Sequence, residues 1–200
     1  MAKIKPLTEK DFHEYIYKVF TSVFTSNDPF NKPIASSLYC RAILYPIAYK
    51  LETIELQAVA LAAQAVGDNG FYLTVTERPN EVEQDRPYHW YIPVEDLESY
   101  YKLSSPFVLE NTLYSHEGKW GMIISHEQHA VIGGSDLFLD TLFSHLLVSA
   151  DQQLTEFLST WKENYTRFQT DIAWLPELLA HVYGEEKAKV LLMQVGLMQE

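Results

Sequence analysis

Residues 110–136 decide the fold of this 200-residue chain, and they have the sequence ENTLYSHEGKWGMIISHEQHAVIGGSD. Short apolar runs alternate here with two polar turns, at 116–119 and 126–128, a spacing that predicts a three-stranded antiparallel meander. The pair Gly133 and Gly134 allows the backbone to bend sharply after the last strand. Ser135 then suits the N-cap of a helix. The stretch therefore predicts a compact sheet that leads directly into a helix.

Two further strands are predicted before the meander. The segments 71–76 and 87–93 are rich in aromatic and β-branched residues, which favour extended backbone. A short helix is expected between them and the meander, over 94–103. Together these segments predict an antiparallel sheet of about five strands in the middle of the chain, over residues 71–133.

The segments on both sides of this sheet are predicted to be helical. Before it, residues 8–66 have apolar positions at helical spacing, with Thr8 as an N-cap, a second helix over 36–45 and a restart at Pro46. After it, a capping box that begins at Ser149 and amphipathic stripes predict helices over 135–196. Helices first, antiparallel strands next and helices last indicate an α+β fold in a single domain, 1–200.

The composition limits the classes of function. The formal net charge is -12, so a nucleic-acid backbone would be repelled and a basic protein would be attracted. The one cysteine, Cys40, allows neither an intrachain disulfide nor a cysteine-based zinc cluster. No signal peptide or membrane-length apolar run is present, which favours a cytoplasmic location without membrane contact. The oligomeric state stays open.

The strongest candidate for chemistry is the second turn of the meander. His126 and His129 could converge on one metal ion, with Glu127 as an oxygen ligand or base. His116 lies in the other turn, which six residues at about 3.3 Å each place roughly 20 Å away. A third ligand would therefore come from elsewhere, for which His89 and His145 are candidates. A metal-dependent hydrolase at this hairpin tip is one of three functional hypotheses, another being a purely structural subunit with no ligand of its own.

The quoted stretch also resembles a segment of small, functionally uncharacterised bacterial α+β proteins, some of which look like the immunity proteins of toxin systems. The shared pattern is a turn, Trp120-Gly121, an apolar strand, a polar tip, a second apolar strand and Gly133-Gly134. It covers residues 110–136. The resemblance implies a binding protein rather than an enzyme, and it assigns no catalytic residue.

The first functional hypothesis is accordingly an interaction protein that engages a basic macromolecular partner, with no cofactor. Between Glu77 and Glu98 the chain has seven acidic residues and two arginines. This stretch is either a solvated face or the contact surface. The predicted contacts are the acidic side chains of this stretch and the hairpin tip: Glu81, Glu83, Asp85, Glu95, Asp96, Glu98, His126 and Glu127.

Overall fold

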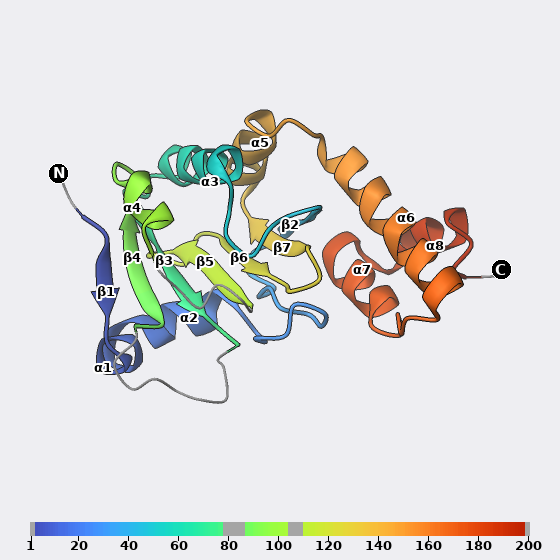
Figure 1. The fold of residues 1–200 in the computed structure, drawn as a ribbon, viewed down its shortest axis with the longest axis horizontal. Helices are drawn as coiled ribbons and strands as arrows, with labels where there is room; N and C mark the ends of the chain where they lie inside the picture. Colours follow the sequence, from blue (N-terminus) through green and yellow to red (C-terminus); the bar gives the residue numbers. More distant parts are fainter. Residues whose placement is uncertain (1–2, 78–86, 104–109, 199–200) are drawn as a thin grey trace.

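A computed structural model describes residues 3–77, 87–103 and 110–198 of the chain. These residues form an α+β fold around one seven-stranded sheet in which all neighbouring strands are antiparallel (Figure 1). The order across the sheet is β1 (Lys5–Leu7), β4 (His89–Pro93), β3 (Gly70–Val75), β5 (Asn111–Ser115), β6 (Gly121–Ile124), β7 (Ala130–Gly134) and β2 (Cys40–Leu44). The predicted α+β class is confirmed.

The sheet has two more strands than predicted because both of its outer strands come from the N-terminal segment. The predicted helix over 36–45 is wrong: β2 runs through it and pairs with β7, with Cys40 opposite Gly134 and Leu44 opposite Ala130. A short apolar run fits a buried strand as well as a helix, and pairing with the meander decides between them. The other outer strand, β1, has only three residues and pairs with β4.

The glycine pair at the end of the meander serves close packing rather than the predicted bend. Gly133 and Gly134 both lie within β7. A Cβ on Gly133 would come within 2.5 Å of Ile34 Cγ2. On Gly134 it would come within 3.0 Å of the Phe138 ring. The absence of side chains therefore lets flanking elements approach both faces of this strand.

Helices α3 (Thr53–Ala65) and α5 (Asp136–Ser144) cover one face of the sheet, with the short α4 (Leu97–Tyr101) beside them (Figure 1). The predicted restart at Pro46 is too early, because α3 begins at Thr53. On this face Trp120 is fully buried and stacks on Phe138, with ring centroids 4.7 Å apart. Its indole N–H donates to the buried carboxylate of Asp68 at 2.8 Å.

The opposite face is covered by helices from both ends of the chain. The N-terminal set is α1 (Glu9–Asp11), the π-helical turn η1 (Phe12–Ile16) and α2 (Tyr17–Val23). The C-terminal set is α6 (Ala150–Phe168), α7 (Leu175–Tyr183) and α8 (Glu185–Gln194). Of these, α6 and α7 pack against β2, and α8 packs against α7 on the outer side (Figure 1). The N-caps predicted at Thr8, Ser135 and Ser149 are confirmed, since each side chain accepts a backbone N–H of the first turn.

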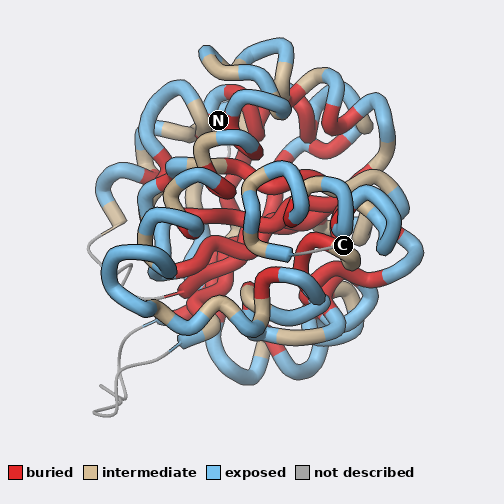
Figure 2. The backbone as a smooth tube through the Cα atoms, turned by 90° about the vertical axis from the view of Figure 1, so that its right-hand side faces the viewer, coloured by how far each residue is buried: buried red, intermediate tan, exposed pale blue. Residues whose placement is uncertain are grey.

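Two hydrophobic cores result, one on each face of the sheet. Figure 2 shows buried backbone segments running through the middle of the molecule within a largely exposed outer layer. In the part of the chain that the structure describes, no helix combines the length and apolarity that a bilayer crossing requires.

Candidate functional site

The candidate site lies where three neighbouring strands end at the same edge of the sheet. In the register, Val75 at the end of β3 is opposite Asn111 at the start of β5, which is opposite Ile124 at the end of β6. Just beyond these positions come Glu77, Glu110 and His126. Antiparallel pairing therefore brings together three side chains that are up to 49 positions apart in the chain.

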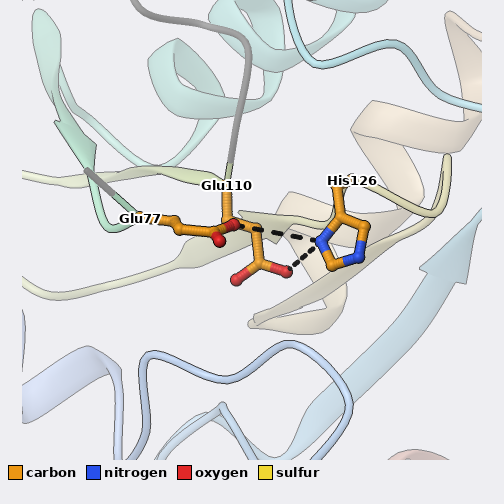
Figure 3. Close-up of side chains that lie close together, drawn as sticks. All are labelled: Glu77, Glu110 and His126. Atoms are coloured by element: carbon orange, nitrogen blue, oxygen red, sulfur yellow. Dashed lines mark hydrogen bonds and ion pairs between the residues drawn. The ribbon is translucent and has the colours of Figure 1, made fainter. Parts of the chain in front are cut away.

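These three side chains point toward one another (Figure 3). His126 Nδ1 lies 2.9 Å from Glu110 Oε1, a hydrogen bond that the carboxylate accepts, and 4.0 Å from Glu77 Oε2. One ligand atom from each residue lies within 4.8 Å of the other two. The side chain of Glu110 is 11 % exposed, whereas those of Glu77 and His126 are about half exposed, at 48 % and 44 %. The cluster is therefore buried at Glu110 and open to solvent at Glu77 and His126.

The buried carboxylate is electrostatically perturbed. Burial raises the pKa of Glu110 from 4.5 to about 6, and the negative charges of Glu77 and Asp28 act in the same direction. The hydrogen bond from His126 opposes these effects. Ionisation of Glu110 therefore costs free energy at this position. A nearby positive charge would offset that cost.

The other turn of the meander provides an internal comparison. Ser115-His116-Glu117 and Ser125-His126-Glu127 are the same tripeptide, and in both turns the serine hydroxyl accepts the N–H of the glutamate. At the first turn Lys119 Nζ lies 2.6 Å from Glu117 and 3.7 Å from Asp68. At the second turn no Lys or Arg of the described residues pairs with a carboxylate of the cluster.

Ligand chemistry fits this arrangement. Carboxylate oxygens and imidazole nitrogens bind divalent first-row metals at about 2.0–2.2 Å, which places adjacent ligand atoms roughly 3–3.5 Å apart. The observed separations of 2.9 and 4.0 Å come close to that spacing. An ion would take the place of the hydrogen-bonded proton between His126 and Glu110, and its open side would be available to water or a further ligand.

His129, the predicted partner of His126, lies in a different environment. Its side chain is fully buried, its ring is stacked parallel to Trp174, and its edges contact Phe30 and Phe157. Burial lowers the pKa of His129 from 6.5 to about 4, so the ring is neutral at physiological pH. Among the described residues, the three-ligand group that includes His126 is completed by Glu77 and Glu110, not by Glu127 and His129.

The other predicted contacts are spread over the molecule. Glu95 is exposed just before α4, and Glu98 is exposed in its first turn. Asp96 is used internally, because it accepts the backbone N–H of Ile4 at 3.1 Å and the hydroxyl of Ser99 at 2.7 Å. Glu127 lies on the hairpin tip, 3.7 Å from His126 Nε2. The predicted contacts Glu81, Glu83 and Asp85 lie outside the described residues.

Sequence reasoning missed Glu77 and Glu110. Both lie next to strand ends, where side chains of neighbouring strands can meet at one edge of the sheet. That signal becomes usable only once β3, β5 and β6 are known to be neighbours.

Comparison with protein-family models, with curated protein sequences and with solved structures found no match to this chain.

Proposed function

We propose that this protein binds a divalent transition-metal ion through Glu77, Glu110 and His126. The observation that carries the proposal is the convergence of three ligand atoms within 4.8 Å from three adjacent strand ends. The raised pKa of Glu110 and the absence of a paired Lys or Arg among the described residues support it, since both indicate uncompensated negative charge. Two carboxylates and one imidazole suit Mn²⁺, Fe²⁺ or Zn²⁺.

Isothermal titration of the metal-free protein with Zn²⁺ and with Mn²⁺ tests this proposal. We expect one ion per chain, with the affinity lost or reduced more than tenfold in Glu110→Gln and His126→Gln. The affinity should also fall below about pH 6, because Glu110 must lose its proton to bind.

A matched control comes from the duplicated tripeptide. His116→Gln removes a histidine in the same local sequence, but at a turn where Lys119 already supplies the positive charge. Its metal affinity should equal that of the wild type. The assignment would be wrong if His116→Gln and His126→Gln lost metal affinity equally. It would also be wrong if metal binding survived in both His126→Gln and Glu110→Gln.

The hydrolase hypothesis takes a revised form at this site. A bound ion with an open coordination position acidifies water, and a carboxylate nearby can accept the released proton. Glu127 is the candidate for that role, because its carboxylate lies 3.7 Å from His126 Nε2. We expect hydrolysis that the metal stimulates in the wild type. In Glu127→Gln this hydrolysis should disappear while metal binding persists.

Binding of a basic partner is a second candidate function, and the immunity-like resemblance stays a prediction. The net charge of -12 supports a basic protein as ligand and opposes nucleic acid. The surface proposed for such a partner, described below, does not include Glu77, Glu110 or His126 in its lining.

A further inference from the structure

A cleft of about 250 Å³ opens between two connecting segments of the fold. One wall is the segment from Leu44 to Glu55, which leads from β2 into α3, and the other is the segment 146–153, which leads from α5 into α6. Most of the lining is apolar, from Pro46, Ile47 and Val148 among others. The cleft therefore offers hydrophobic contact to a ligand.

A second hollow of about 430 Å³ continues the first. The two hollows share Pro46, Ile47, Glu52 and Glu55 as lining residues, and the second one extends to Gln128 at the β6–β7 turn. Because these four residues line both hollows, the two are adjacent and together are called the groove. A ligand that occupies both hollows must pass along these shared residues, which a peptide segment can do.

Two carboxylates lie where the hollows meet. Glu52 is exposed and Glu55 is partly buried, and neither forms an ion pair within the described residues. One oxygen of Glu55, Oε2, is shielded from solvent and has no hydrogen-bond partner among the described residues. Ionisation of this carboxylate is therefore costly, and a positive charge held in the groove beside it would offset that cost.

The rim of the groove carries apolar side chains in contact with solvent. Leu147 is 84 % exposed and Ile54 is 42 % exposed, and both line the first hollow. A small cation seated on Glu55 would leave Leu147 uncovered, whereas a polypeptide would cover both features at once.

We propose that this groove binds a segment of a partner protein that presents an arginine or lysine side chain next to an apolar residue. The cationic group donates to Glu55 and Glu52, and the apolar neighbour packs on Leu147 and Ile54. Charge complementarity with a protein of net charge -12 favours the same partner through long-range attraction. The groove does not include Glu77, Glu110 or His126, so this proposal stands independently of metal binding.

Amide chemical-shift titration with three short probes tests the proposal. The probes are acetyl-Leu-Arg-Leu-amide, the same peptide with neutral citrulline in place of arginine, and arginine amide alone. We expect the arginine peptide to shift amides of 44–55 and 146–153, and the citrulline peptide to bind about tenfold more weakly. Added salt should weaken the arginine peptide.

Variants locate the contacts. Glu52→Gln with Glu55→Gln should abolish the difference between the arginine and citrulline peptides, and Leu147→Ser should weaken both. Glu185→Gln with Glu186→Gln, two exposed acids on α8, serves as the control and should change neither affinity. An amide spectrum of the Glu52/Glu55 variant with the wild-type dispersion, and with shifts confined to the neighbourhood of the two substitutions, shows that it is folded. This readout does not depend on metal binding and separates this test from the metal-site test.

Three outcomes would overturn the proposal. The first is equal binding of the charged and neutral peptides. The second is a set of shifts confined to other surfaces or absent at millimolar peptide. The third is arginine amide binding as tightly as the peptide, which would assign the groove to a small cation.

Discussion

Replacing Glu110 with glutamine should stabilise the metal-free protein at neutral pH while it removes metal affinity. The structure holds this carboxylate in a buried position that raises its pKa from 4.5 to about 6. Glutamine has nearly the same shape and can still hydrogen-bond His126, but it carries no charge to desolvate.

The magnitude follows from the pKa shift. A difference of about 1.5 units at 1.36 kcal/mol per unit corresponds to roughly 2 kcal/mol. The folded state binds the proton more tightly than the unfolded state, so unfolding free energy falls as pH rises from 4.5 to 6. The penalty is fully present above about pH 6 and absent below about pH 4.5. The gain of Glu110→Gln should follow the same profile.

Urea unfolding with a chelator present, at half-unit steps from pH 4.5 to 7.5, measures this gain. At pH 7.5 the variant should be more stable by about 2 kcal/mol, which for a chain of this size corresponds to a rise in Tm of about 4–8 °C. Asp140→Asn, an exposed acid of α5 that forms no ion pair among the described residues, is the control for loss of one negative charge.

Two results would refute the reasoning. One is a Glu110→Gln variant that is equally or less stable at pH 7.5. The other is a gain that is independent of pH or grows toward acid, since either shows that desolvation of this carboxylate does not set the difference.

Three further predictions concern stability. His129 and His181 both have pKa values lowered to about 4, mainly by burial, so the free energy of unfolding should fall as pH drops from 6.5 to 4. In His129→Gln the free energy of unfolding should fall less steeply over this range, and an unchanged pH dependence would contradict this. Gly121→Ala places a Cβ on top of Val23 and should cost about 1–3 kcal/mol in urea unfolding, whereas a neutral effect would mean that α2 can move. Ser149→Ala removes the N-cap of α6 and should cost about 1 kcal/mol, measured by thermal melting against an exposed serine variant.

Local sequence signals predicted the parts of the fold that local interactions determine. The caps at Thr8, Ser135 and Ser149 are side chains that bond to backbone within three residues. The two turns of the meander, at 116–119 and 126–128, connect β5 to β6 and β6 to β7, because each connection is short and polar. Such signals do not depend on the rest of the chain.

The elements that were wrong or missing depend on partners far away in the chain. Residues 40–44 form a strand because β7 offers an open edge, and their apolar run is buried on both faces. The same reason explains the site. The sequence predicts that His126 shares a metal site with the nearby His129, whereas strand register places His126 next to Glu110 and Glu77. Strand order, which the sequence pattern does not contain, decides both cases.

The placement of the two outer strands also has a kinetic consequence. Both β1 and β2 precede every interior strand in the chain, and each pairs with a strand more than 80 residues later. During synthesis these segments emerge first and wait without their partners until β4 and β7 have been made. Closure of such distant pairs is entropically slow, so the sheet should assemble from its centre and acquire both edges last. Until then β4 and β7 are open edges, which makes the half-built sheet the stage most exposed to self-association.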